Sequence, residues 1–305
     1  MKRRPGTAGH RLHGLVTAAF GRHYEVLIDG GCLQGYPRGK KSVFACGDEV
    51  DIAPHGDGQG AIEHLHPRRN LLWRSDAFRE KLIAANLTQV VIVVATEPAF
   101  SDLLVSRCLC AAESQDLKTL IVLNKADLAE RLPAARAALA TFTALGYRVV
   151  ELSALAGADT LRPLLAGERS ILVGQSGMGK STLTNALIPE ANAATREISS
   201  ALDSGKHTTT FARLYPLPDE GWLIDSPGLQ AFGLAHLEPD HLAECFVEFR
   251  PHLGQCRFRD CRHDTEPGCA LRAALEAGAI HPRRFEHYRS IRGEIAEARR
   301  LNPGW

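Results

Sequence analysis

The stretch Gly174-Gln175-Ser176-Gly177-Met178-Gly179-Lys180-Ser181 decides the fold of the central part of this chain. Its glycines let the backbone wrap around anionic oxygens, and the lysine of such a loop reaches the β- and γ-phosphates of a nucleotide. The serine hydroxyl is offered to Mg²⁺ at the start of a helix whose dipole favours negative charge. An apolar run at 170–173 and a helical pattern at 182–187 supply the required strand–loop–helix context. We therefore predict a phosphate-binding loop that extends to Thr182 and in which Lys180 is catalytic.

A second motif, Asn124-Lys125-Ala126-Asp127, reads the base. It follows the apolar run 119–123, and ligands of parallel sheets bind at the carboxyl ends of strands. The Asp127 carboxylate can accept from the ring N–H and the exocyclic amine of guanine, a donor pair that adenine lacks. Asn124 can fix the loop, and the stem of Lys125 can cover the base. The tetrapeptide alone is commonplace, but together with the phosphate loop it predicts binding of GTP and GDP.

Three further segments complete a nucleotide site. Ser153-Ala154 follows a predicted strand at 147–152 and would contact the guanine oxygen through its backbone. In Asp225-Ser226-Pro227-Gly228, Asp225 would act in catalysis by holding the magnesium shell, and the Gly228 amide would sense the γ-phosphate. In Gly205-Lys206-His207-Thr208-Thr209-Thr210 one of the three threonines is expected to bind Mg²⁺, and Thr209 is the preferred candidate. Without its neighbours, this last segment would be interpreted as a solvated loop rich in small polar residues.

The order of the motifs is reversed, because the base-reading motif precedes the phosphate loop. In an ordinary GTPase the phosphate loop comes first. The order predicts a circularly permuted α/β P-loop GTPase domain over 75–235, with a parallel sheet covered on both faces. In such a domain the second switch leads straight into the segment that follows.

The N-terminal residues 1–74 are predicted to form an all-β OB-fold barrel that binds RNA. Short strands at 14–19, 23–28, 47–53 and 61–65 are separated by glycine turns. Basic and aromatic side chains could form a face for RNA, although a solvated surface with two packed aromatic rings explains them equally well. These side chains are Arg22, Arg38, Lys40, Lys41, Arg68, Arg69, Arg74, Tyr36 and Trp73.

Composition is that of an ordinary globular protein, with 45% hydrophobic and 23% charged residues and a net charge of +1 over 305 residues. This charge argues neither for nor against a nucleic-acid partner. The basic start Met1-Lys2-Arg3-Arg4 is not followed by an apolar h-region, so it is not a secretory signal. No apolar run approaches membrane-spanning length. We expect a cytoplasmic protein with no membrane partner.

The eight cysteines fall into two groups. Five are scattered and are expected to be small buried hydrophobes: Cys32, Cys46, Cys108, Cys110 and Cys245. The other three, Cys256, Cys261 and Cys269, cluster around His263. Three thiolates and one imidazole complete a tetrahedral zinc site, which would be structural. Because the spacing is not that of a standard finger, a redox thiol pair or His252 as the fourth ligand remain alternatives.

The C-terminal residues 236–305 are predicted to be a mostly helical zinc-binding domain. Its last helix, at about 282–301, carries many arginines. These either contact RNA phosphates or cover the zinc segment, and the RNA interpretation is favoured because arginines outnumber acids there. The arginines are Arg283, Arg284, Arg289, Arg292, Arg299 and Arg300.

With these residues assembled, the chain resembles, over nearly its whole length, the ribosome small-subunit-dependent GTPase A family. Its most specific marks are the motif order, the segment 205–209 and the spacing of Cys256, Cys261, His263 and Cys269. The resemblance implies GTP hydrolysis with Mg²⁺, stimulated by the small subunit. It also implies a structural Zn²⁺ and binding to the 30S subunit and its 16S rRNA late in maturation, with release on hydrolysis. We expect a monomer.

The position after Gly228 departs from many GTPases, which place a water-orienting glutamine there. Here it is Leu229, and Gln230 is out of register. His207 is the better candidate because an imidazole can orient or deprotonate water near neutral pH, although it could instead cap the switch loop. Ser226 stands where the family usually has threonine, a mild change.

Two other classes of function are compatible with parts of this sequence. The chain could be an RNA-binding scaffold with nucleotide as a structural ligand, or a permuted GTPase acting on the large subunit. The intact Lys180, Ser181 and Asp225 favour an enzyme. An ATP-dependent role would leave the base-reading motif without a purpose.

Overall fold

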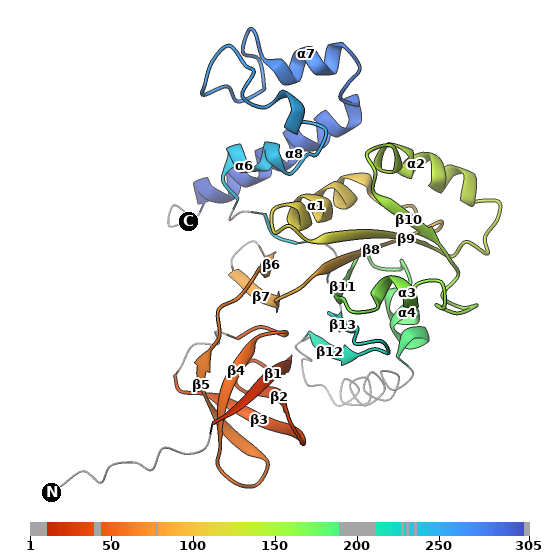
Figure 1. Ribbon diagram of the computed structural model, residues 1–305. Coiled ribbons are helices and arrows are strands. Elements are labelled where there is room, and N and C mark those ends of the chain that lie inside the picture. Colours follow the sequence, from red (N-terminus) through yellow and green to blue (C-terminus); the bar gives the residue numbers. More distant parts are fainter. Residues whose placement is uncertain are drawn as a thin grey trace, which may run out of the picture.

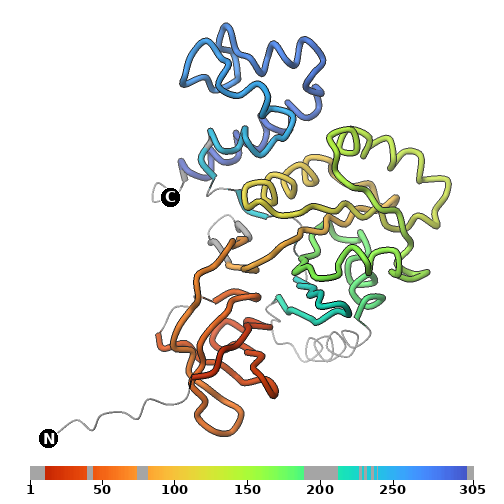
Figure 2. Tube along the Cα trace, in the orientation of Figure 1, coloured from red at the N-terminus to blue at the C-terminus, as the bar shows by residue number. Residues whose placement is uncertain are grey.

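The structure is a computed structural model that describes residues 11–39, 44–76, 79–188, 212–226, 229, 232–234 and 237–301. Three parts follow one another along the chain: a β-barrel, an α/β unit and a helical C-terminal part (Figure 1). The barrel and the C-terminal part lie at opposite ends of the molecule, with the α/β unit between them (Figure 2).

The N-terminal barrel is closed by five strands: β1 (Leu12–Ala19), β2 (Tyr24–Ile28), β3 (Gly31–Pro37), β4 (Glu49–Pro54) and β5 (Gln59–Leu65). Their order is β1-β2-β3-β5-β4, and β4 pairs back onto β1. Only the β3–β5 pair is parallel. This closed barrel confirms the predicted OB-like fold. Strand β3 was not predicted. Its Gly35 packs so closely that a Cβ there would lie 2.9 Å from Val26, and this small residue hides the apolar alternation of the strand.

A hairpin of β6 (Leu71–Asp76) and β7 (Arg79–Ala85) connects the barrel to the α/β unit. Asn86 follows it and ties the two parts together. Its side chain donates to the Gly47 carbonyl at 3.0 Å and accepts from the Arg69 amide at 2.8 Å. The boundary that we predict at 74/75 lies inside this hairpin.

Within its described residues, the α/β unit has six strands: β8 (Gln89–Ala95), β9 (Lys118–Asn124), β10 (Arg148–Glu151), β11 (Arg169–Val173), β12 (Arg213–Pro216) and β13 (Trp222–Asp225). They are ordered β10-β9-β8-β11-β13-β12, and all pairs are parallel except β12–β13. Every residue of β8 is buried, as expected of a strand covered on both faces. Strand β11 comes late in the chain, yet it lies in the middle of the sheet.

Helices cover both faces of this sheet (Figure 1). Helices α1 (Asp102–Glu113) and α2 (Leu132–Ala144) share a core with one face of β8, and α3 (Arg162–Leu165) and α4 (Lys180–Leu187) share a core with the other. Helix α1 was not predicted. The Ser101 hydroxyl caps it by accepting from the Leu104 amide.

The C-terminal part consists of α6 (Pro239–Glu244), the short 3-10 helix η1 (Arg250–His252), α7 (Ala270–Glu276) and α8 (Pro282–Leu301). Its aromatic residues join the same core as α1, and Phe246, Phe249 and Tyr288 pack ring against ring. Among the described helices, none combines the length and the hydropathy that a membrane span requires.

Candidate nucleotide site and metal centre

The phosphate loop runs from the end of β11 to the start of α4, as predicted. Two of its glycines cannot be replaced by a residue that has a Cβ atom. A Cβ on Gly174 would lie 2.1 Å from the Val93 carbonyl oxygen, and one on Gly179 would lie 2.2 Å from the Asn124 side chain. Gly179 also has φ +87°, a conformation that L-residues rarely adopt. The loop therefore keeps its shape only with glycine at these positions.

Lys180 folds back over the loop and lies beside the end of β13. Its ammonium donates to the carbonyl oxygens of Gly174 and Gln175, the latter at 2.7 Å. Burial lowers the pKa of Lys180, and the Asp225 carboxylate opposes that shift. Burial raises the pKa of Asp225, which Lys180 in turn lowers. The sheet thus brings one cation and one carboxylate together, as phosphoryl transfer on a magnesium nucleotide requires.

Asn124 ties three nucleotide motifs to one another. Its side chain is 2% exposed. The amide nitrogen donates to the Met178 carbonyl of the phosphate loop at 2.9 Å. The amide oxygen accepts from the Ala154 N–H at 2.9 Å. Residues that are far apart in sequence therefore share one buried amide, and the predicted role of Asn124 in holding the loops follows from this geometry.

The rest of the base-reading motif lies at the surface beside Asn124. Lys125 has φ +59°, and its ammonium donates to the Glu97 carbonyl at 2.7 Å. Asp127 is exposed, where a base could reach its carboxylate. Ser153 is half-buried, and its carbonyl accepts from the Ala156 N–H at 2.9 Å, which closes the turn after β10.

A contact that the sequence does not reveal joins the phosphate loop to α1. The Gln175 side-chain oxygen accepts from the Ser101 N–H at 2.6 Å, and Ser101 is the residue that caps α1. Gln175 and Ser101 lie on different strand–loop units, so no local pattern predicts their contact.

The remaining predicted nucleotide ligands divide into described and undescribed residues. Ser176, Gly177 and Ser181 are exposed, and Thr182 is half-buried in the first turn of α4. Leu229 is completely buried, so it belongs to the core and does not face a reacting water. Three predicted residues lie outside the described residues: His207, Thr209 and Gly228.

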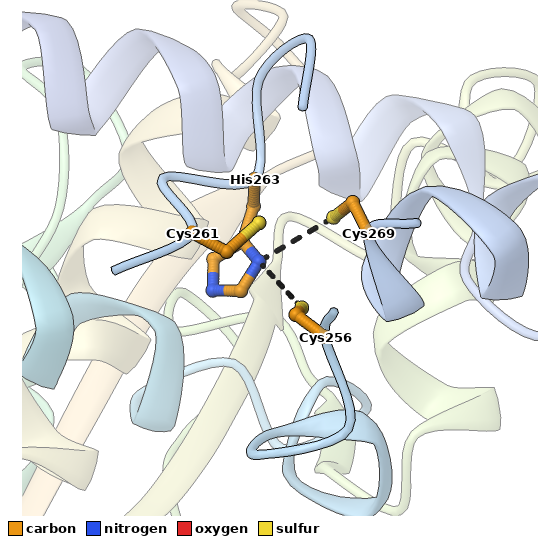
Figure 3. Close-up of side chains that lie close together, drawn as sticks. All are labelled: Cys256, Cys261, His263 and Cys269. Carbon is orange, nitrogen blue, oxygen red and sulfur yellow. Dashed lines mark hydrogen bonds between the residues drawn. The ribbon is translucent and has the colours of Figure 1, made fainter. Parts of the chain in front are cut away.

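The second site is a group of Cys256, Cys261, His263 and Cys269, whose ligand atoms all lie within 4.8 Å of one another. The Nδ1 atom of His263 is 3.5 Å from the sulfurs of both Cys256 and Cys269 (Figure 3). A tetrahedral ion with ordinary zinc–sulfur and zinc–nitrogen lengths requires about 3.5 Å between such atoms. The group can therefore hold a metal ion. Among the described residues, its fourth member is His263 rather than His252.

The backbone around these four residues is held by a carboxylate. Glu266 accepts from the backbone N–H groups of Arg262 and Asp264, at 3.0 and 2.9 Å. Backbone hydrogen bonds lower the pKa of Glu266 to about 2. Burial lowers the pKa of His263, and the Arg292 charge lowers it further. A neutral imidazole is the form that binds a metal.

The scattered cysteines mostly behave as predicted: Cys46, Cys108, Cys110 and Cys245 are buried. The prediction is wrong for Cys32, which is exposed on β3. Cys32 is exposed because it lies beside the turn of the β2–β3 hairpin, where it pairs with Leu27.

The arginines of α8 all contact other residues of the chain, and the RNA interpretation stays a prediction for Arg283, Arg289 and Arg300, whose side chains are more than half exposed. Arg284 is 1% exposed and pairs with Glu248 at 2.6 Å, while Arg283 pairs with Asp102 of α1 at 2.8 Å. The other four contact, in order, Asp264, the Arg262 carbonyl, Glu238 and Glu297. Helix α8 therefore docks onto α1 and covers the metal-ligand segment.

On the barrel, the predicted basic face is smaller than the sequence indicates. Arg68 binds the buried Asp48 carboxylate through two hydrogen bonds of 2.7 Å, and Arg38 pairs with Glu63. Arg22, Arg69 and Tyr36 are exposed. Trp73 is half-buried. Lys40, Lys41 and the Arg74 side chain lie outside the described residues.

Comparisons with known proteins agree with this geometry. The sequence model of the family described as RsgA GTPase matches residues 65–235. A protein of Burkholderia pseudomallei (strain 668) named Small ribosomal subunit biogenesis GTPase RsgA is 55% identical over 295 residues, which cover 95% of this chain and 94% of that protein. A protein of the same name from Bordetella pertussis is 54% identical over 297 residues, covering 96% and 99%.

Solved structures are similar as well. The crystal structure of YjeQ from Thermotoga maritima has a TM-score of 0.73 and 31% identity, covering 94% of this chain and 99% of that one. The crystal structure of YloQ, a circularly permuted GTPase, has a TM-score of 0.69 and 26% identity, covering 97% and 98%. With its reversed motif order and a phosphate loop on the central strand, the chain belongs to the RsgA GTPase family.

Proposed function

We propose that this protein hydrolyses GTP in the late maturation of the 30S ribosomal subunit, in the cytoplasm. It binds the subunit and its 16S rRNA in the GTP state, the subunit stimulates hydrolysis, and hydrolysis releases the protein. The observation that carries this proposal is the 55% identity, over 95% of the chain, to proteins named for small-subunit biogenesis. The Lys180–Asp225 arrangement supports it, because a cation and a carboxylate beside the phosphate loop suit the phosphates of GTP and their Mg²⁺.

The nucleotide would lie between the phosphate loop and the base-reading motif. Asp127 would accept from guanine, and the backbone around Ala154 would meet the guanine oxygen. Ser181 and Asp225 would hold Mg²⁺, with Thr209 as a further ligand. The buried Asp225 carboxylate beside Lys180 fits this hard cation, which prefers oxygen ligands. The ion would neutralise charge that develops on the phosphate oxygens.

Hydrolysis requires a group that orients water, and Leu229 cannot supply it because its side chain is apolar and completely buried. We propose His207 for this role. A His207→Ala variant should lower subunit-stimulated turnover at least tenfold and leave GTP affinity unchanged. Gln230→Ala serves as the matched control and should keep the parent turnover. Equal turnover of the parent and His207→Ala would exclude the role.

The conformational change between the GTP and GDP states would be transmitted to the C-terminal part through α1. Gln175 of the phosphate loop binds the capping residue of α1 at 2.6 Å. The same helix pairs with α8 through Asp102–Arg283 and Arg107–Glu294. A shift of the phosphate loop on binding of the γ-phosphate would therefore displace α1, the helix that α8 contacts. If small subunits bound equally well with GDP and with a non-hydrolysable GTP analogue, this coupling would be refuted.

For the metal centre we propose one structural Zn²⁺ held by Cys256, Cys261, His263 and Cys269. All four ligand positions come from the protein, so no place remains for a reacting water. Cys261→Ser should lose the metal, and Cys32→Ser, a change at an exposed cysteine outside the group, should retain it. Metal analysis that finds well below one zinc per chain in the parent protein would contradict the assignment.

We also propose the division 1–74, 75–235 and 236–305, and a monomer. The RNA contact of the first part would be made by the exposed Arg22, Arg69 and Tyr36, since Arg68 is committed to Asp48. Arginine and an aromatic ring suit the phosphates and unstacked bases of RNA.

The experiment that tests the proposal compares GTP hydrolysis by the protein alone, with 30S subunits and with 50S subunits. We expect strong stimulation by 30S subunits only. Stimulation by 50S subunits alone would assign the protein to the other subunit. If neither stimulates, the protein would be an RNA-binding scaffold with a structural nucleotide.

A further inference from the structure

A second group of metal-ligand side chains lies on the outer wall of the barrel. It consists of His13 on β1, Asp51 on β4 and His66 just after β5, and one ligand atom from each lies within 4.8 Å of the others. The Asp51 Oδ1 and His66 Nε2 atoms are 2.8 Å apart. The His13 and His66 rings meet edge to face, with their centroids 5.1 Å apart. This group has no part in the nucleotide site or the cysteine cluster.

The pairing of the strands brings the first two residues together. His13 and Asp51 are direct partners in the antiparallel β1–β4 pair. On β4, the flanking Val50 and Ile52 are completely buried and fill the barrel core. Because side chains alternate along a strand, Asp51 points to the outer face, and its partner His13 lies on the same face.

A bulge in β5 adds the third residue. Ile52 pairs with Ile62, but Asp51 pairs with His64, so Glu63 is an extra residue. Without the bulge, Asp51 would pair with Glu63, and the alternation would turn His64 and His66 toward the core. The bulge instead directs both histidines to the face of Asp51, and bulges often re-aim side chains beside sites. Glu63 itself is neutralised by Arg11 and Arg38.

The donor types at this place suit a transition metal ion. Three imidazoles, those of His13, His64 and His66, face the single Asp51 carboxylate. Asp51 and His66 are half-buried, with 26% and 34% of their side chains exposed. Imidazole nitrogen with one carboxylate oxygen is a donor set that suits zinc and its first-row neighbours better than magnesium or calcium.

We propose that His13, Asp51 and His66 form a second, surface site for a divalent transition metal ion such as Zn²⁺. Ordinary zinc–nitrogen and zinc–oxygen lengths require about 3.4 Å between ligands of a tetrahedral ion. The donor atoms already lie within 4.8 Å of one another, so the site would close through small rotations of these side chains. Three protein ligands leave a position for water or for a donor from a partner. The ion would link β1, β4 and β5.

The test is calorimetric titration of the full-length protein with Zn²⁺, after its cysteine cluster has been shown by native mass spectrometry to be zinc-loaded. The parent protein should bind one further Zn²⁺ per chain. His13→Ala and Asp51→Asn should each weaken this second binding at least tenfold and keep the first zinc. His55→Ala is the matched control, an exposed histidine on the same barrel outside the group, and should bind like the parent.

Two results would overturn the proposal. One is the absence of a second zinc in the parent protein. The other is second-zinc binding by His13→Ala as tight as that of the parent, which would leave Asp51 and His66 as an ion pair only. Unchanged GTP binding by each variant verifies that it is folded, so a loss of zinc cannot be attributed to unfolding.

Discussion

Replacing Asn124 by alanine should weaken the binding of GTP and of GDP by the same large factor. The change removes two hydrogen bonds and leaves the Met178 carbonyl and the Ala154 N–H, both in buried residues, without this partner. Each unsatisfied buried group costs about 1–3 kcal/mol. Because water can reach part of an opened loop, we expect about 2–3 kcal/mol in total. At 1.4 kcal/mol per decade, this corresponds to about 30- to 150-fold in Kd.

The loss should be equal for the two nucleotides because Asn124 joins the loops around the base and the phosphate loop, and its contacts do not include a γ-phosphate group. The assay is equilibrium titration with fluorescent GTP and GDP analogues. A matched control is Asn86→Ala. Asn86 is 3% exposed against 2% for Asn124, and it also makes two hydrogen bonds to backbone groups. Its φ of +55° adds about 1 kcal/mol of strain in the variant.

Asn86→Ala should therefore lower the free energy of unfolding at least as much as Asn124→Ala does, and it should leave nucleotide affinity unchanged. If Asn124→Ala bound both nucleotides within threefold of the parent, the bridging amide would not organise the site. If GTP binding alone were weakened, the effect would have to come from the γ-phosphate contacts, and the reasoning would be equally refuted.

Three further outcomes are expected. Gly179→Ala should abolish nucleotide binding in the same titration, because its Cβ would meet a side chain at 2.2 Å, whereas Gly146→Ala, with φ +90° and open space around it, should bind normally. Arg284→Met should destabilise the C-terminal part by about 3–5 kcal/mol in denaturant unfolding, because it leaves the Glu248 carboxylate buried and unpaired. A double variant, Arg284→Met with Glu248→Leu, should recover much of that lost stability. If it recovered none, the pairing argument would be refuted. Glu266→Ala should speed metal loss to a chelator several-fold. The pKa of Glu266 in the folded protein, about 2, lies below its ordinary value of 4.5, so the carboxylate stabilises the loop above about pH 4.5 and loses that effect only as the pH falls toward 2. The ratio of the metal-release rate of Glu266→Ala to that of the parent protein should therefore be the same at pH 7 and pH 5.

Features whose chemistry is local could be predicted from the sequence. The phosphate loop is readable because its glycines are required by the path of the backbone, and this shows in consecutive residues. The base-reading motif lies at a strand end, and the four residues that can hold a metal ion fall within one short segment. The barrel was also predictable, since alternation and glycine turns mark most of its strands.

Local sequence patterns did not predict one helix, the exposure of one cysteine or the long-range contacts. Helix α1 was missed because its apolar face consists largely of alanine and cysteine, which are weak signals of helical periodicity. The exposed Cys32 was misjudged because its exposure depends on its place beside the turn of the β2–β3 hairpin. The ion pairs of the α8 arginines were not predictable because their partners, such as Asp102 and Glu248, lie far away in sequence.

Tertiary structure alone decided which distant side chains meet. Asn124 reaches the phosphate loop only because β9 and β11 flank β8 in one sheet. His66 reaches Asp51 only because one extra residue in β5 shifts the register. A motif states which groups a segment offers. Which groups come within 3 Å of one another depends on strand order, register and packing, and these are properties of the whole chain.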